Sequence, residues 1–182
     1  KEELLSTKPD YVQAKYLERG DYLIFNVNRR INDNNEFTKD RMKLLGYYLA
    51  EGYIIAKGRA VAFAFNKKEK KPIEELKKLL FIFTGKPAKW RIRGNVCEIY
   101  SCSTKLVNFL KAHAGSLARK KRLSEDIMLL PYDKQQELLK TYHIGDGDFY
   151  RRRPFDSLTY RIVTTSTFLA VQIQEIFARG GI

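Results

Sequence analysis

The sequence contains little cysteine: only Cys97 and Cys102 occur among its 182 residues. Two cysteines are too few for a disulfide scaffold, and too few for a zinc site with its usual four ligands. We expect both to be half-buried in strands. Long apolar runs are also missing, because Glu and Lys interrupt them, so no segment offers the roughly 20 apolar residues of a membrane span. The first residues lack the regions of a signal peptide, so we expect a cytoplasmic protein.

Acidic residues are scarce relative to basic ones. The chain has 34 Lys and Arg against 21 Asp and Glu, which gives a net charge of +13 and a pI near 9.7. Such a field attracts polyanions and favours a nucleic-acid partner, although a merely soluble basic protein has the same composition. The basic residues are spread through many segments and do not gather on one amphipathic helix, which argues against a membrane partner.

Residues 1–37 differ in pattern from the rest. They predict a short helix or turn over 14–17, a strand over 22–27, and a polar linker in "INDNNEF", whose Asn and Asp residues favour turns. We therefore place a boundary near Phe37.

From Thr38 onward, the pattern predicts a helix, two strands, a helix, two strands and a helix. Thr38 is a candidate N-cap, and the glycines that close the three helices are Gly52, Gly85 and Gly115. The two hairpins turn at 57–59 and at 94–95. The same order restarts at 132 with a helix that ends in Asp-Gly, then a hairpin and a helix that ends in glycines.

The two series are in register with each other. Subtracting 51 from 146, and 85 from 180, gives an offset of 95 in both cases. A constant offset indicates an internal repeat. The second copy lacks the last hairpin and helix of the first, so we expect either a fragment or a partner half supplied by a second chain.

The two corresponding helices, "LLGYYLAEG" and "LKTYHIGDG", each carry small residues four positions apart. Gly46 and Ala50 form one stripe, and Thr141 and Gly145 form the other. Small residues allow two helices to approach closely, so we expect these stripes to form a helix interface. That packing would bring Glu51 and Asp146 side by side.

Two neighbouring carboxylates repel each other unless a cation lies between them. Mg²⁺, or another divalent cation such as Mn²⁺, suits these oxygen ligands and also binds phosphate. The backbone carbonyls of Ala50 and Gly145, near the helix ends, are further candidate ligands. Leu49 and Ile144, just before them, are expected to pack in the interior.

These two nonamers resemble the paired motifs of LAGLIDADG homing endonucleases, especially those found in inteins. The resemblance covers residues 38–182. It implies an α+β fold, an αββαββα unit repeated with pseudo-symmetry, with a first subdomain over 38–131 and an incomplete second one over 132–182. It further implies antiparallel saddle sheets in the DNA major groove and catalysis by Glu51 and Asp146 through a bound metal ion. Glu51 departs from the commoner Asp.

Two further segments resemble parts of inteins. "KRLS", from Lys121, matches a Lys-x-Ile-Pro stretch whose lysine assists catalysis, with Ser124 in place of Pro; the alternative is a solvated basic run. "VQAKYLERGDYL" resembles part of a splicing domain, so residues 1–37 are assigned to a partial splicing or linker segment. Self-splicing is not supported, because Lys1 is not a nucleophile and no His-Asn pair ends the chain.

The strands are expected to present cations to DNA on one face. Alternation places Trp90, Ile92, Tyr160 and Ile162 on a core face. The candidate DNA-binding residues are Lys57, Arg59, Arg91, Arg93, Arg151, Arg152, Arg153, Thr159 and Arg161. A charged, solvated outer face is the alternative.

We therefore expect a metal-dependent, site-specific endonuclease of double-stranded DNA, encoded in an intein, and nucleoid-associated in a prokaryote. A DNA-binding relic that no longer cuts and an RNA-binding maturase of the same fold remain open.

Overall fold

The computed structural model describes residues 10–21, 27–152 and 157–181. The strand expected over 22–27 lies mostly outside this part of the chain, whereas the short helix near residue 14 is present as a 3-10 turn, η1, Ala14–Tyr16. Within the described residues, no helix is long and apolar enough to cross a membrane.

The first unit follows the expected order of elements. Thr38 caps the first helix by accepting a hydrogen bond from the Arg41 amide, and Gly85 ends the second helix in the left-handed conformation. The elements are α2 (Lys39–Glu51), β1 (Gly52–Ile55), η2 (Ala56–Gly58), β2 (Ala60–Asn66), α3 (Lys70–Thr84), β3 (Lys89–Arg93), β4 (Val96–Ser101) and α4 (Thr104–Ala114).

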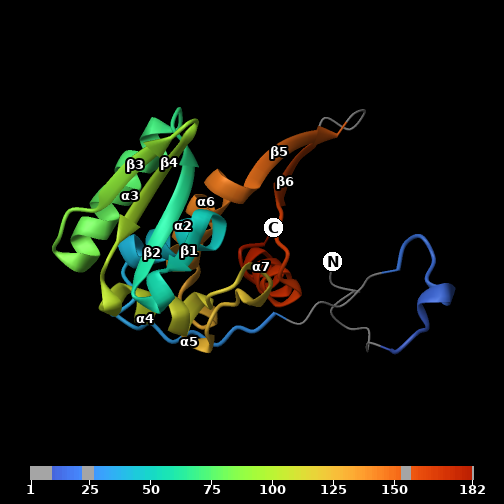
Figure 1. Ribbon diagram of the computed structural model, residues 1–182. Coiled ribbons are helices and arrows are strands. Elements are labelled where there is room, and N and C mark those ends of the chain that lie inside the picture. The colour runs from blue at the N-terminus through green and yellow to red at the C-terminus, as the bar shows by residue number, and fades with distance from the viewer. Residues whose placement is uncertain (1–9, 22–26, 153–156, 182) are drawn as a thin grey trace.

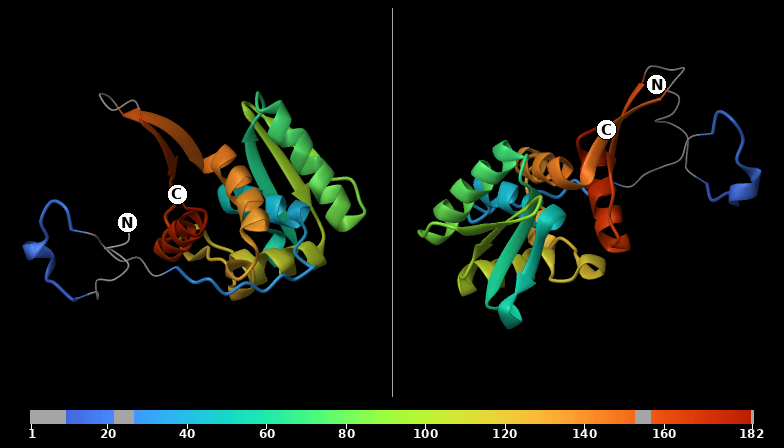
Figure 2. Two further views of the ribbon diagram at one scale, coloured as in Figure 1. Left: turned by 180° about the vertical axis from the view of Figure 1, so that it is seen from behind. Right: turned by 45° about the horizontal axis from the view of Figure 1, so that its top comes forward.

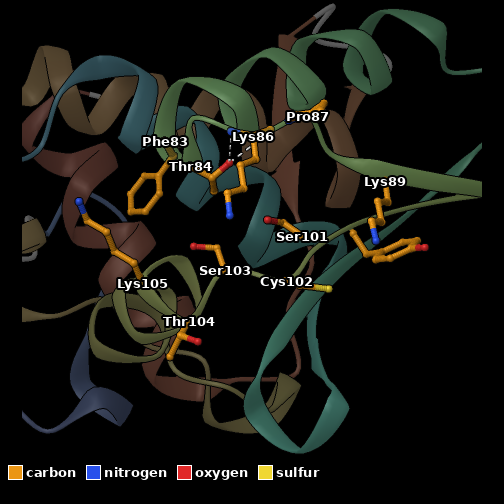
Figure 3. Close-up of a pocket in the computed structure, with 11 residues that line it drawn as sticks. Phe83, Thr84, Lys86, Pro87, Lys89, Ser101, Cys102, Ser103, Thr104 and Lys105 are labelled. Carbon is orange, nitrogen blue, oxygen red and sulfur yellow. Dashed lines mark hydrogen bonds between the residues drawn. The ribbon is translucent and has the colours of Figure 1, made fainter.

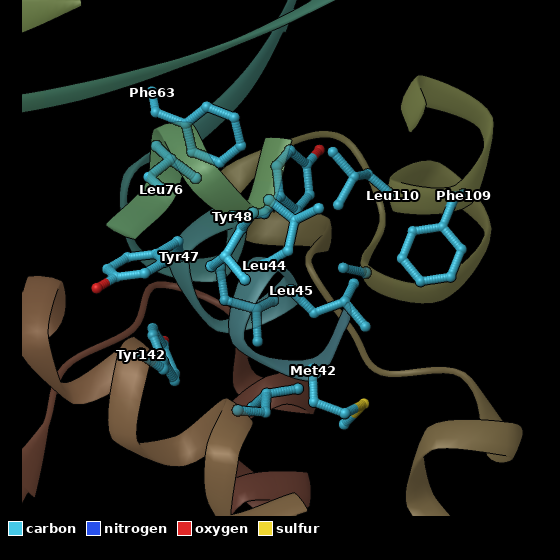
Figure 4. Packing of buried hydrophobic residues seen from close by; sticks show 14 of the residues in the cluster. Met42, Leu44, Leu45, Tyr47, Tyr48, Phe63, Leu76, Phe109, Leu110 and Tyr142 are labelled. Atoms are coloured by element: carbon cyan, nitrogen blue, oxygen red, sulfur yellow. The ribbon is translucent and has the colours of Figure 1, made fainter. Parts of the chain in front are cut away.

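The four strands form one antiparallel sheet in the order β1-β2-β4-β3. Alternate residues of β2 and β4, including Phe63, Phe65 and Ile99, face α2, α3 and α4 and are buried. Tyr48 of α2 packs edge-on against Phe63 (Figure 4). Tyr47 packs in the same way against Phe65. The helices therefore cover one face of the sheet, and the other face is available to a ligand.

β3 departs from the expected alternation. Trp90 and Ile92 do point away from Arg91 and Arg93, but they are 54% and 53% exposed. They lie opposite the buried Ile99 and Cys97 of β4, so the predicted face is confirmed, but the prediction that they are core residues is wrong, because β3 is an edge strand with a neighbouring strand on one side only. The Lys77 ammonium instead lies over the Trp90 ring, 4.8 Å from its centroid.

A connection leads from the first unit to the second. It contains η3 (Ala118–Lys120) and α5 (Glu125–Met128). The second unit then consists of α6 (Tyr132–Asp146), the antiparallel pair β5 (Gly147–Arg152) and β6 (Ser157–Ile162), and α7 (Thr167–Arg179). The β5–β6 hairpin projects from the end of α6, away from the rest of the fold (Figure 1).

α2 and α6 lie side by side between the two units (Figure 2). α7 closes the second unit on the same side as α5: the Gln172 amide both accepts from the Leu123 amide and donates to its carbonyl, each at 2.8 Å. The polar linker before α2 and the residues that precede it are also bonded to the second unit: Lys134 donates to Asp33, and Arg179 donates to the carbonyls of Asn28 and Arg30. The linker thus runs along the second unit before it enters the first.

Candidate metal centre and nucleic-acid interface

The small-residue stripes of α2 and α6 meet. A Cβ placed on Gly46 would lie 2.0 Å from Thr141 Oγ1 and 2.3 Å from the Leu138 carbonyl oxygen. A Cβ placed on Gly145 would lie 2.5 Å from the Ala50 Cβ. Only residues without a side chain fit at these two points, so the helices are in backbone contact.

A buried hydrogen bond joins the two helices. The Thr141 hydroxyl donates to the Lys43 carbonyl of α2 at 2.9 Å. Thr141 is 2% exposed, so this bond forms away from water and fixes the register of the helices.

Glu51 and Asp146 are the last residues of α2 and α6. A Cβ on Gly145, the neighbour of Asp146, would lie 3.1 Å from Glu51 Oε1. The Glu51 carboxylate therefore lies against the end of α6, and both acids are half-buried where the helices give way to β1 and β5. Ala50 and Gly145 occupy the last turns, whose carbonyls have no following helical amide to pair with.

Burial raises the pKa of Glu51 to about 7, with further increases from Asp146 and Glu69, while Lys121 opposes them. Burial likewise raises the pKa of Asp146, and Lys121 again lowers it. The pair resists ionisation in its own surroundings, so a cation between the carboxylates would stabilise their charged form. Within the described residues, no group of three or more His, Cys, Asp or Glu side chains is placed to hold a metal ion. Two carboxylates with backbone carbonyls, water and phosphate fit a hard cation such as Mg²⁺, which keeps much of its coordination for non-protein oxygens.

Lys121 is buried behind this pair, at 7% exposure. Its ammonium donates to the carbonyls of Tyr48 and Leu49 at 2.8 Å and to that of Gly52 at 3.0 Å. It therefore caps the C-terminal end of α2. The alternative of a solvated basic run is wrong for this residue, although it holds for its exposed neighbours Arg119 and Lys120.

The surroundings of Lys121 set its pKa. Burial lowers the pKa to about 8, against the charges of Asp146 and Glu51. The Lys121 carbonyl accepts from the Ser166 hydroxyl at 2.6 Å, which ties the start of α7 to the same point. The sequence offered no signal for this capping role, because Lys121 and α2 are about 70 residues apart.

Two residues near the motif acids differ in burial. Leu49 is buried at 2% exposure, as expected, but Ile144 is 46% exposed, so the expectation that it packs in the interior is wrong. Helix α6 has fewer neighbours at its end than α2, because in the described part of the chain the second sheet has two strands and the first has four.

The candidate DNA-binding residues lie in the turns and strands of both sheets. Lys57 belongs to η2 with a left-handed backbone, at a φ of 54°, and Arg59 follows it at the hairpin tip. The others lie as follows: Arg91 and Arg93 in β3, Arg151 and Arg152 in β5, Thr159 and Arg161 in β6. Arg153 lies outside the described residues, as do the side chains of Arg151 and Arg152.

Two of these arginines are paired with carboxylates. Arg91 Nε donates to Glu98 on β4, and Arg161 donates through Nε and a terminal nitrogen to Asp148 on β5. Glu98 is not among the residues predicted from the sequence, because only the strand register brings it opposite Arg91.

A hollow of about 570 Å³ lies where the end of α3, the start of β3, the end of β4 and the start of α4 meet (Figure 3). Three lysines and several hydroxyl groups line it, and none of its residues belongs to α2 or α6. It therefore contains neither motif acid.

This architecture, two sheets joined by a pair of helices that end in acids, is the LAGLIDADG endonuclease fold, as expected from the sequence. Solved structures of the homing endonuclease I-DmoI share it. A variant bound to its target DNA with Mn matches with a TM-score of 0.57 and 16% identity, over 81% of this chain and 78% of that one. I-DmoI in complex with DNA and Ca matches with a TM-score of 0.56 and 14% identity, over 80% and 73% of the two chains.

Curated relatives are similar in sequence over most of this chain. An iron–sulfur cluster assembly SufBD family protein of Mycobacterium tuberculosis is 28% identical over 187 residues, which is 98% of this chain and 21% of that protein. A DNA polymerase of Thermococcus litoralis is 31% identical over 149 residues, 79% of this chain and 8% of the polymerase. The chain thus spans a quarter or less of the relatives it matches. No family model matches the sequence.

Proposed function

We propose that this chain is a homing endonuclease that cuts double-stranded DNA at a specific site with the help of a divalent cation. The observation that carries the proposal is the meeting of Glu51 and Asp146 at the ends of two helices in backbone contact. The likeness to a fold that other proteins use on target DNA supports it.

Each part of the site has a task in this proposal. Glu51 and Asp146 hold the cation, Mg²⁺ or Mn²⁺, with the Ala50 and Gly145 carbonyls as further donors. When bound, such a cation lowers the pKa of a water molecule and offsets the charge of the phosphate under attack. The close helix contact fixes the separation of the two acids. Lys121 contributes a positive charge beside them and keeps the end of α2 in place.

We further propose that the chain is encoded in an intein. Similar stretches occur in an iron–sulfur assembly protein and in DNA polymerases, proteins with unrelated names, and each time they make up a minor share of the length. A mobile element inserted into different hosts explains this distribution. Residues 1–37, which resemble a splicing-domain segment, are consistent with it.

Cleavage of a randomised duplex plasmid library in Mg²⁺ tests the nuclease proposal, with Glu51→Gln and Asp146→Asn as matched variants. These variants keep the shape of the site but remove its charge. We expect each to lower the cleavage rate about 100-fold or more, because a metal ion supplies several kcal/mol of charge stabilisation. Equal cutting by both variants and the parent would show that the acids do not carry the reaction.

Binding measured beside cleavage separates the other functions. A parent that binds one duplex tightly in Mg²⁺ but never cuts it would be a DNA-binding relic. Preference for structured RNA over duplex DNA at matched salt would indicate a maturase, and salt must be matched because both affinities depend on it steeply.

A further inference from the structure

The outer face of the first sheet carries a hydrogen-bonded group of three side chains. The Tyr53 hydroxyl on β1 donates to Glu98 Oε1 on β4 at 2.6 Å, and Arg91 Nε on β3 donates to Glu98 Oε2. Tyr53 reaches across β2 because the β2 residues opposite Tyr53 and Glu98 are Ala62 and Ala64. Side chains from three strands thus position one guanidinium group.

The second unit holds an arginine in a similar way. Arg161 Nε donates to Asp148 Oδ1 at 2.8 Å, and a terminal nitrogen donates to Oδ2. Asp148 is the repeat counterpart of Tyr53, because the two positions differ by the offset of 95. The two residues directly opposite them in the strand register are Arg161 and Ala62. Each unit therefore presents one arginine that a carboxylate holds on its outer face.

Both carboxylates stay ionised. Arg91, and then the Tyr53 hydroxyl, lower the pKa of Glu98, and Arg161 lowers that of Asp148. Each arginine and its partner therefore have little net charge together, and their attraction to a phosphate is weak. The arginines nonetheless remain 46% and 58% exposed.

The carboxylate also fixes the direction of each guanidinium. Arg91 gives only Nε to its carboxylate, whereas Arg161 gives Nε and one hydrogen of a terminal nitrogen. In both, each terminal nitrogen keeps at least one hydrogen to donate on the edge of the guanidinium away from the carboxylate. Two parallel donors held rigidly match guanine, whose O6 and N7 accept a bidentate pair in the major groove. Such an arginine is suited to binding a base edge and poorly suited to binding the phosphates of the DNA backbone.

We propose that Arg91 and Arg161 each read a guanine, one in each half of the target site, and that Glu98, Tyr53 and Asp148 are positioning residues. This inference rests on the proposed function, since it assumes a duplex DNA target. Arg93, two residues from Arg91 on the same face, forms no ion pair within the described residues and is assigned to phosphate contact.

Selection of bound duplexes from a randomised library tests this proposal, with Ca²⁺ replacing Mg²⁺ to limit cleavage. The parent should enrich sites with two fixed guanines. Arg91→Ala should erase the preference at one of them and Arg161→Ala at the other, each by about 5- to 150-fold, the discrimination typical of a bidentate contact. Arg93→Ala, the matched control, should weaken all sequences alike and reduce the slope of log affinity against log salt by about one.

The positioning role has its own readout. Glu98→Gln leaves Arg91 in place but removes the carboxylate that neutralises its charge. We expect the guanine preference to fall while binding to unrelated duplexes becomes tighter and more dependent on salt. A residue needed only for folding would lower both, and thermal unfolding of each variant records that case.

Two results would overturn the proposal, and they are distinguishable. If the parent enriches a site but Arg91→Ala and Arg161→Ala weaken every sequence by one factor, the arginines contact phosphate and only this inference fails. If the parent enriches no duplex at all, the proposed function fails with it.

Discussion

Gly46→Ala tests the helix contact on which the site depends. The added methyl would lie 2.0 Å from Thr141 Oγ1 and 2.3 Å from the Leu138 carbonyl oxygen. Carbon and oxygen that are not bonded need more than 3 Å, and the Leu138 oxygen belongs to the backbone of α6 and cannot rotate away. The helices must therefore separate or slide.

The expected cost combines three terms. Inserting a methyl into a packed interior costs about 1–3 kcal/mol. Loss of the Thr141 to Lys43 hydrogen bond adds about 1 kcal/mol. Alanine recovers about 1 kcal/mol, because it is a better helix former than glycine. The net destabilisation is about 2 kcal/mol, or about 4–8 °C in melting temperature for a domain of this size.

Thermal and urea unfolding of the parent and of Gly46→Ala measure this change. Thr141→Ala on top of Gly46→Ala provides the control: it removes the Oγ1 contact but leaves the Leu138 oxygen in place, so it should not restore the parent stability. An unchanged or raised melting temperature in Gly46→Ala, as expected for an exposed helical glycine, would refute the close contact of α2 and α6.

Three further predictions follow from the same site. Gly145→Ala should destabilise the protein through its contact with the Ala50 Cβ, and Ala50→Gly should restore most of the loss, since here the obstacle is a side chain; unfolding of the single and double variants checks this. Lys121→Met should cost about 2–4 kcal/mol, because three buried carbonyls lose their donor, and a cost under about 0.5 kcal/mol in urea unfolding would contradict the capping role. The pKa of Glu51 is about 7 in the fold against 4.5 ordinarily, so the folded protein binds the proton more tightly, and stability should fall as pH rises from 4.5 to 7. Allowing for partial solvent exposure, this loss is about 1–2 kcal/mol. Glu51→Gln should remove this share of the loss and leave the share of Asp146, whose pKa is also raised, and Mg²⁺ should raise the melting temperature of the parent at pH 8 but not at pH 5.

The sequence predicts the elements well where local chemistry determines them. Thr38 caps α2, Gly85 ends α3 and Gly94 turns the second hairpin, because each needs only its own neighbours. The offset of 95 also predicts that α2 and α6 correspond, since repeated sequences fold into repeated structures.

Features that depend on distant residues were not predictable. Trp90 alternates as a core residue does, yet the edge position of β3 leaves it exposed, and edge position is a property of the whole sheet. Ile144 matches Leu49 in the repeat but not in burial. Glu98 and the buried Lys121 gain their roles from partners across the fold, which spacing along the chain does not record.

The charges at the helix ends are consistent with the proposed cation site in a protein of net charge +13. Glu51, Asp146 and Lys121 together leave one negative charge when the acids are ionised. The C-terminal ends of α2 and α6 each add a dipole equivalent to about half a negative charge. The local total is about two negative charges, which one divalent cation neutralises. Without Lys121, no positive charge of this group would offset the repulsion between the two acids. With a second buried lysine, the local charge would fall from about two negative charges to about one, and the attraction for a divalent cation would halve. Lys121, the one lysine buried among the described residues, thus offsets the charge of the proposed cation site and also caps the end of α2.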